Sequence, residues 1–178
     1  MIRTAIIVAS ALVLTACASG PPTDPYNGPP AQQVFQVPGV NAEQLYEGSR
    51  QWIAENFKSA KSVIEYESRD TLTIIGNGRS ADNVACLSFG VENLELDSTC
   101  MHPVSMEFTL KVEAKDGRMR LSVPNLSLYR AAYINSYNSG GDWSQPAGEV
   151  AYPVLSKRVL NYGDDIAAYV NGLGEDTF

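Results

Sequence analysis

Thiol chemistry is the first chemistry that the sequence offers, because its three cysteines stand in two different settings. Cys17 ends a short apolar run near the N-terminus, whereas Cys86 and Cys100 enclose 13 residues in the middle of the chain. The two cysteines of a redox site are usually separated by two residues, so the wider spacing here argues against a redox site. A zinc site is also disfavoured, because His102 is the only histidine in the chain. In an exported chain such a pair predicts a structural disulfide, whose loop closure is worth about 3 kcal/mol.

The segment before Cys17 indicates export. It carries one positive charge at Arg3, and an apolar run then extends from Ala5 to Leu14. A membrane-spanning helix needs about 20 apolar residues, so this run is too short to span a bilayer and is typical of a secretory signal peptide. We therefore assign residues 1–16 to a signal peptide.

The end of that segment, Leu14-Thr15-Ala16-Cys17, resembles the lipobox of bacterial lipoproteins. The resemblance implies diacylglyceryl transfer to Cys17, cleavage before it and acylation of the new N-terminus; an ordinary signal peptide with a chance cysteine is the alternative. Several acyl chains anchor a protein stably, since each buried CH₂ contributes about 0.8 kcal/mol. Residue 18, directly after the lipidated cysteine, is Ala and not Asp. In lipoproteins of Gram-negative bacteria this pattern implies transfer to the outer membrane, so we expect the chain at the periplasmic face of that membrane.

Composition then divides the rest of the chain. Residues 17–33 comprise the lipidated cysteine and a stretch with five prolines and two glycines, which predicts a flexible tether. Residues 34–178 are enough for a single domain.

The chain has 20 acidic and 13 basic residues, a formal net charge of −7. An acidic chain without a visible basic stripe argues against nucleic acid as a partner.

A helix is predicted over residues 41–58. Asn41 is a good N-cap, and Gln44 completes a capping-box pattern three residues later. One face of this helix is apolar at helical spacing and consists of Leu45, Ser49, Trp52, Ile53 and Phe57.

Five strands are predicted around this helix, at residues 34–40, 62–68, 71–78, 104–114 and 118–123. The last two alternate apolar and polar residues on either side of a turn at Lys115-Asp116-Gly117. Across that turn we expect Arg118 and Arg120 to face Glu113 and Glu107. Pro124 shifts the phase of the apolar residues, which predicts a bulge or a strand end there.

A final helix is predicted after Pro153, ending at Asn171-Gly172, with Gly163 weakening it by about 1 kcal/mol relative to alanine. The order is β-α-β-β-β-β-α. It predicts an α+β fold, a two-layer sandwich in which a mostly antiparallel sheet of about five strands carries two helices on one face.

Several motifs occur in the order of a known family: Leu45-Tyr46, Trp52, Phe57, Ser59 to Tyr66, Ile74 to Gly78, and the hairpin "KDGRMRLSV". Together they resemble the hallmark of the domain-of-unknown-function family 4468. The resemblance covers about residues 34–130 and implies a TBP-like fold. Residues 80–103, with both central cysteines, depart from the pattern and indicate an insertion. The family has no assigned catalytic residues, and DNA binding does not follow from a fold label.

The candidate binding surface consists of aromatic residues between the last strand and the last helix: Tyr129, Tyr133, Tyr137 and Trp143. A long aromatic loop can bind a protein or peptide partner. Packing of these aromatics on their own domain is the alternative.

Catalytic motifs are not apparent. The chain has neither a GxSxG nor an HExxH motif, and neighbouring carboxylates such as Asp164-Asp165 point apart on a helix. The acidic residues Glu92, Glu95 and Asp97 suit a solvated loop better than a calcium site. We therefore expect no enzyme, cofactor or metal, but a non-catalytic binding or assembly module. An envelope hydrolase with an unrecognised site and a purely structural spacer remain the alternatives.

Overall fold

The computed structural model describes residues 24–57, 63–80, 105–130, 133–134, 139–140 and 143–175. The predictions for the signal peptide, for Cys17, Cys86 and Cys100, and for Tyr137 lie outside these residues.

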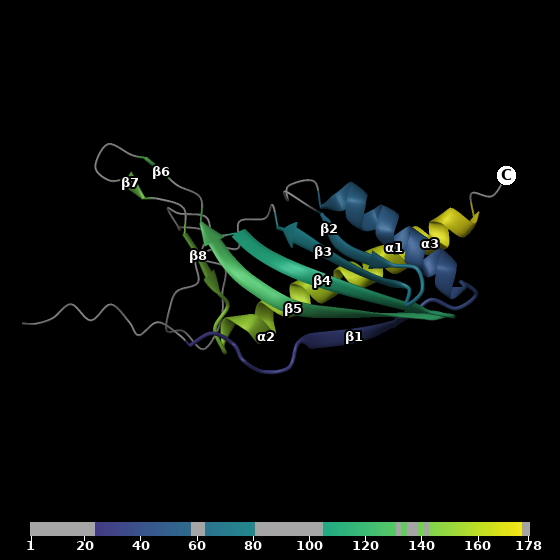
Figure 1. Ribbon diagram of the computed structural model, residues 1–178, viewed down its shortest axis with the longest axis horizontal. Helices are drawn as coiled ribbons and strands as arrows, with labels where there is room; N and C mark the ends of the chain where they lie inside the picture. Colours follow the sequence, from purple (N-terminus) through teal and green to yellow (C-terminus); the bar gives the residue numbers. More distant parts are fainter. Residues whose placement is uncertain are drawn as a thin grey trace, which may run out of the picture.

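The core of the fold is an antiparallel sheet (Figure 1). Its strands lie in the order β1-β5-β4-β3-β2, and β8 also pairs with β5. A separate two-stranded pair contains β6 and β7. The bounds are β1 (Ala31–Gln36), β2 (Ile64–Ser68), β3 (Thr73–Arg79), β4 (Ser105–Lys115), β5 (Arg118–Arg130), β6 (Tyr133–Ile134), β7 (Ser139–Gly140) and β8 (Trp143–Pro146).

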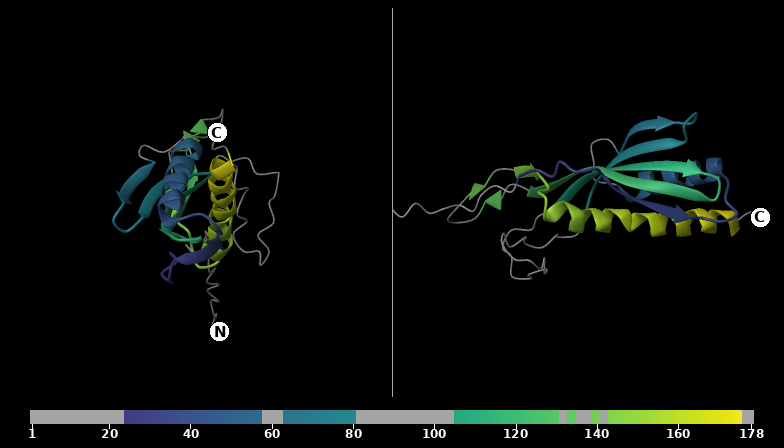
Figure 2. Two further views of the ribbon diagram at one scale, coloured as in Figure 1. Left: turned by 90° about the vertical axis from the view of Figure 1, so that its right-hand side faces the viewer. Right: turned by 90° about the horizontal axis from the view of Figure 1, so that it is seen from below.

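Helices cover one face of this sheet, which confirms the predicted two-layer α+β fold (Figure 2). They are α1 (Ala42–Asn56), α2 (Ala151–Leu160) and α3 (Tyr162–Glu175). The prediction of a single final helix after Pro153 was wrong in its bounds. The observed helical segment begins earlier, at Ala151, which is possible because proline is tolerated in a first helical turn. It divides at Asn161 and continues through Asn171-Gly172. No helix within the described ranges is long and apolar enough to span a membrane.

Helix α1 follows its sequence signals closely. The side chain of Asn41 accepts from the backbone N–H of Gln44 at 2.9 Å, and the side chain of Gln44 accepts from the backbone N–H of Asn41 at 3.1 Å. This capping box satisfies two groups that the helix end leaves unpaired. The predicted apolar face is buried, together with Tyr46 and Gly48, the latter against Val170 of α3.

Pro124 lies at a bulge, as its position predicted. Thr109 pairs with Asn125, whereas Lys111 pairs with Ser122, so β5 has one residue more than β4 at this point. On the other side of β5, the ladder with β1 ends at Val123, and the ladder with β8 begins only at Ser127. Proline has no N–H to donate, so it fits the gap between these two ladders.

The predicted boundary between tether and domain needs correction. Strand β1 begins at Ala31 and not at residue 34, and Pro25 and Tyr26 before it already contact the domain. The ring of Tyr26 stacks on Tyr152 at a centroid distance of 4.0 Å, and its backbone N–H donates to the carbonyl of Ala147 at 3.0 Å. An aromatic ring that can bury its surface stabilises an ordered position even in a proline-rich segment.

The inner face of the sheet contains the two glycines of the motif from Ile74 to Gly78. A methyl group at Gly78 would lie 2.6 Å from Cε2 of Phe108 and closer still to Cζ. That ring packs edge-on against Phe57, with centroids 5.4 Å apart. Gly78 therefore makes room for an aromatic core, and the motif has a packing role.

Candidate functional site

The outer face of the sheet, opposite the helices, is one candidate surface. Along β4 the side chains of Met106, Phe108, Leu110, Val112 and Ala114 are buried on the helical side, while the alternate residues are half-buried on the other. Among the described residues, no helix packs against that second side (Figure 2). The outer face is therefore a rigid, solvated platform built on a well-packed layer.

Strand register fixes which outer-face side chains are neighbours, because residues directly opposite on antiparallel strands point to the same face. We describe the face as rows that run across the strands, starting beside the β4–β5 turn. The first row has Gln36, Arg118 and Lys115; the second has Val34, Arg120, Glu113 and Thr73; the third has Gln32, Ser122, Lys111, Ile75 and Tyr66. Further along follow Asn125, Thr109 and Asn77, then Ser127, Glu107 and Arg79, then Tyr129 and Ser105.

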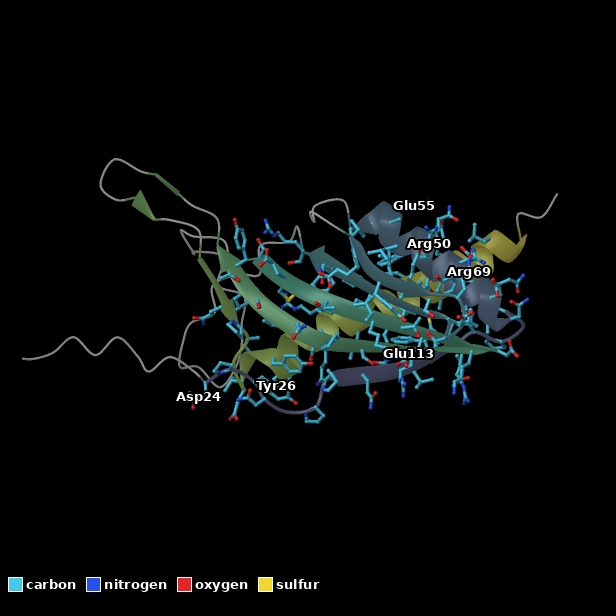
Figure 3. The ribbon with its side chains drawn as sticks, viewed as in Figure 1. Asp24, Tyr26, Arg50, Glu55, Arg69 and Glu113 are labelled. Carbon is cyan, nitrogen blue, oxygen red and sulfur yellow. The ribbon has the colours of Figure 1, made fainter. Side chains whose placement is uncertain are left out.

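Basic residues gather in the first three rows, although the chain as a whole is acidic. We call Lys111, Lys115, Arg118 and Arg120 the basic cluster. Glu113 lies among them and accepts from Arg120 at 2.7 Å and from Lys111 at 3.1 Å. Burial raises the pKa of Glu113, but these hydrogen bonds outweigh it and hold the pKa below its ordinary value of 4.5. Glu113, which is labelled in Figure 3, is therefore a carboxylate at neutral pH.

A shallow pocket of about 290 Å³ lies within the basic cluster. It is lined by Val34 of β1, by Thr71 of the β2–β3 connection and by residues on both sides of the β4–β5 turn, including Lys115, Arg118 and Arg120. Val34 is 50% exposed, so its apolar surface is available within a charged rim. The pocket therefore combines cations, one carboxylate and one apolar side chain.

The far rows contain a second polar group, around Arg79. Its guanidinium forms an ion pair with Glu107 and lies over the ring of Tyr129 at 3.9 Å from the centroid. The hydrogen bond to Glu107 raises the pKa of Arg79. This arrangement corrects the sequence prediction for Glu107, which pairs with Arg79 and not with Arg118 or Arg120. Only the predicted pairing of Arg120 with Glu113 is confirmed.

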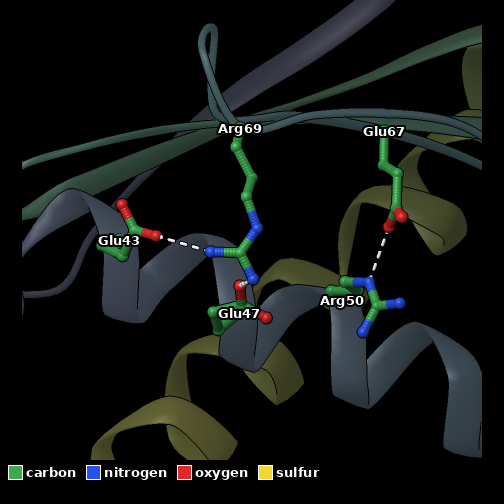
Figure 4. Close-up of polar contacts among 5 residues, drawn as sticks. All are labelled: Glu43, Glu47, Arg50, Glu67 and Arg69. Carbon is green, nitrogen blue, oxygen red and sulfur yellow. Dashed lines mark hydrogen bonds and ion pairs between the residues drawn. The ribbon is translucent and has the colours of Figure 1, made fainter.

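A depression of about 490 Å³ lies at the side of the molecule, between α1 and the β2–β3 connection. Two arginines bridge these elements (Figure 4). Arg50 donates to Glu67 at 2.6 Å, and Arg69 pairs with Glu43 at 2.9 Å and with Glu47. Since both guanidinium groups are already paired with carboxylates, this depression offers less to a charged ligand than the outer-face pocket does.

The predicted aromatic surface is only partly described. Tyr129 lies on the outer face of β5, half-buried beneath Arg79. Tyr133 belongs to β6 and Trp143 to β8, so strands occupy positions where a loop was expected. The side chains of Tyr133 and Trp143 lie outside the described part of the chain. The four aromatic residues are therefore not shown to form one surface.

The sequence contained a signal for the basic cluster that the charge argument missed. Lys111 and Lys115 lie at even spacing on one strand, and Arg118 and Arg120 at even spacing on the next, so all four share one face of a hairpin. The overall negative charge concealed this local excess.

Comparison with known proteins agrees with this architecture. A family model described as a domain of unknown function with a TBP-like fold (DUF4468) matches residues 32–129, which run from β1 through nearly all of β5 and include α1. A search of the curated proteins finds no match.

Two solved structures of bacterial proteins are similar to the chain. A TBP-like protein from Parabacteroides distasonis is 8% identical, with a TM-score of 0.52 over 78% of this chain and 92% of that one. A DUF4468 family protein from Bacteroides ovatus is 14% identical, with a TM-score of 0.48 over 77% of this chain and 80% of that one. The family match spans more than half of the sequence and contains the whole outer-face platform except β8. The chain therefore belongs to the DUF4468 family.

Proposed function

We propose that this protein is a lipid-anchored, non-catalytic binding module of the cell envelope, and that the outer face of its sheet is the binding surface. The observation that carries the proposal is a broad sheet face that no described helix covers, with two half-exposed apolar side chains on it. Val34 and Tyr66 are each 50% exposed, near opposite edges of this face.

Their position supports binding because burial of apolar surface drives most protein association. Polar side chains around them are already arranged by cross-strand contacts, such as the 2.9 Å hydrogen bond from Thr109 to Asn77. A surface that is ordered before binding loses little conformational entropy when a partner docks. The face therefore suits recognition by shape and charge.

The anchoring part of the proposal rests on the sequence around Cys17. The chain meets the domain at Asp24, so few residues separate the lipidated cysteine from the folded part. At about 3.5 Å per residue, the connection reaches at most about 25 Å. A short connection of this kind keeps the domain close to the membrane surface, where envelope partners are concentrated.

The test is a pull-down from chemically crosslinked cells that carry the anchored chain. We compare the wild type with Val34→Asp/Tyr66→Asp on the outer face and with the matched control Val154→Asp/Leu173→Asp. The control residues are 41% and 43% exposed, on α2 and α3. We expect a partner that is captured by the wild type and by the control but lost in the outer-face variant.

Two results would count against the proposal. Capture that survives in the outer-face variant would place binding elsewhere, and the absence of any captured protein would favour a spacer. Fractionation of a Cys17→Ser variant tests the anchor separately. We expect this variant to lose membrane association. Unchanged association would show that acylation of Cys17 does not anchor the protein.

A further inference from the structure

Two cations of the basic cluster face each other without a counter-charge. Lys115 and Arg118 are directly opposite across the β4–β5 turn, and both line the outer-face pocket. Neither forms an ion pair with another described residue, whereas Arg120 shares Glu113 with Lys111. Like charges directly opposite on neighbouring strands are unfavourable. This pair therefore marks a place where a bound anion would remove a repulsion.

The turn that carries these cations is held in place, so the repulsion is not relieved by movement of the hairpin. The carboxylate of Asp116, which lies between the two cations in the sequence, is turned to α1 and accepts from the N–H of Ala42 at 2.8 Å. Gly117 donates to the carbonyl of Val40 at 2.9 Å and accepts from the N–H of Val37 at 2.8 Å. Two hydrogen bonds to the β1–α1 connection and one to the first residue of α1 thus hold the backbone of the turn that carries the two cations.

We propose that this pocket binds an acidic segment of a partner protein in extended conformation. One carboxylate of the segment lies between Lys115 and Arg118, and a second, two residues along, contacts Arg120. An apolar side chain two residues further along, which points to the same side of the extended segment, covers Val34. This inference rests on the proposed function and adds the class of ligand that the proposed binding surface recognises.

The spacing of the cations favours a peptide over a compact anion. Arg118 and Arg120 lie two residues apart on one face of β5, which in a strand separates them by about 6.8 Å. Alternate side chains of an extended peptide have the same separation. Glu113 and the exposed Val34, both at the pocket, would be poor neighbours for phosphate but suit a backbone N–H and an apolar side chain of a peptide.

The position of the pocket argues against the chain's own membrane as the occupant. The first described residue, Asp24, lies beside the end of the sheet where β8 pairs with β5, since Pro25 bridges to Gly148 (Figure 3). Arg118 begins β5 at the other end of the sheet, nine residues before Ser127, the first residue to pair with β8. Nine strand residues span about 30 Å, so the pocket lies far from the point where the connection to Cys17 begins.

The experiment measures binding of a fluorescein-labelled peptide, Glu-Ser-Glu-Ser-Val, to the full acylated chain in neutral detergent by fluorescence anisotropy. Both carboxylates and the valine of this peptide lie on one side when it is extended. The neutral peptide Gln-Ser-Gln-Ser-Val is the comparison ligand. Lys115→Gln/Arg118→Gln removes the opposed pair. Lys157→Gln/Arg158→Gln removes the same charge from α2 and serves as the matched control.

We expect the acidic peptide to bind and the neutral one to bind more weakly, with an affinity that falls as added salt shortens the screening length. Lys115→Gln/Arg118→Gln should weaken acidic-peptide binding by about 3- to 10-fold, since exposed ion pairs are individually weak. The control should stay within about twofold of the wild type. The pocket variant should unfold at the same temperature as the wild type or higher, because it loses a repulsion.

Three outcomes would overturn the inference: no binding of the acidic peptide, equal losses in the two variants, or displacement of the peptide by inorganic phosphate at equal charge. The proposed function is tested independently by the crosslinked-cell experiment. A cellular partner that is lost in Val34→Asp/Tyr66→Asp but kept in Lys115→Gln/Arg118→Gln would retain the outer face as the binding surface and refute only the acidic-segment assignment.

Discussion

Replacement of Gly163 by alanine gives a sharp test of how α3 packs on the sheet. Helix propensity alone predicts that the variant gains stability, because alanine is favoured over glycine within a helix by about 1 kcal/mol. The structure predicts the opposite sign. Gly163 is buried against Phe35, and a methyl group there would lie 2.6 Å from Cδ2 of that ring and closer to Cε2 and Cζ.

The magnitude follows from the space available. Phe35 is 5% exposed and belongs to the inner face of β1, so its ring cannot move outward without opening the core. Overpacking of this kind costs about 1–3 kcal/mol. Subtracting the gain of about 1 kcal/mol in propensity, we expect Gly163→Ala to lower the free energy of unfolding by up to about 2 kcal/mol, which is a fall of up to several degrees in the unfolding midpoint.

The same helix provides the control. A methyl group at Gly172 meets no atom within 4 Å, so Gly172→Ala should raise stability by up to about 1 kcal/mol. In a Phe35→Ala background the clash disappears, and Gly163→Ala should then be neutral or stabilising. Urea unfolding of these variants, followed by circular dichroism, measures all three effects. If Gly163→Ala stabilises the chain as much as Gly172→Ala does, the reasoning about this contact is refuted.

Three further predictions concern the sheet. Lys115→Glu should raise the free energy of unfolding by about 0.5–1 kcal/mol at low salt, because it turns a like-charged cross-strand pair with Arg118 into an attractive one; a gain that is independent of salt would contradict this reading. Tyr152→Phe should cost about 1–3 kcal/mol in thermal unfolding, since the buried hydroxyl accepts from the N–H of Ala31 at 2.9 Å and donates to the carbonyl of Val123; an unchanged midpoint would show that these bonds are replaced. Glu113→Gln should lower the free energy of unfolding at neutral pH, and this loss relative to the wild type should shrink as the pH falls below 4.5. A carboxyl whose pKa is lowered by folding stabilises the folded state above its unfolded pKa, and this contribution is lost as the pH falls through its folded pKa. Urea unfolding at several pH values checks this, and a difference that grows in acid would contradict it.

The sequence was most informative where local chemistry decides the structure. The capping box at Asn41, the apolar face of α1, the alternation of β4 and the bulge at Pro124 all follow from residues close together in the chain. The motif residues that carry the family resemblance, among them Leu45, Trp52, Phe57 and Gly78, are core or packing residues. They therefore predicted the fold. The hairpin motif also contains Lys115, Arg118 and Arg120 of the basic cluster, but the match itself did not mark them as a site.

The rest depended on contacts between distant segments. Tyr26 could not be placed by composition, because its position depends on Tyr152, far along the chain. From the sequence, Gly163 only weakens a helix, but in the fold it makes room for the ring of Phe35, which is far away in the chain. The pocket likewise joins Val34, Thr71 and Arg118 from three parts of the sequence. Its basic residues share a face by simple alternation, but their neighbours follow only from strand register.

The outer sheet face as the binding surface is the central claim, and site-specific photocrosslinking in cells tests it most directly. A benzophenone amino acid replaces either Val34 on the outer face or Val154 on α2, two valines that are 50% and 41% exposed. We predict an adduct with a partner protein from position 34 and none from position 154. Adducts from position 154 alone, or from neither position, would contradict the account.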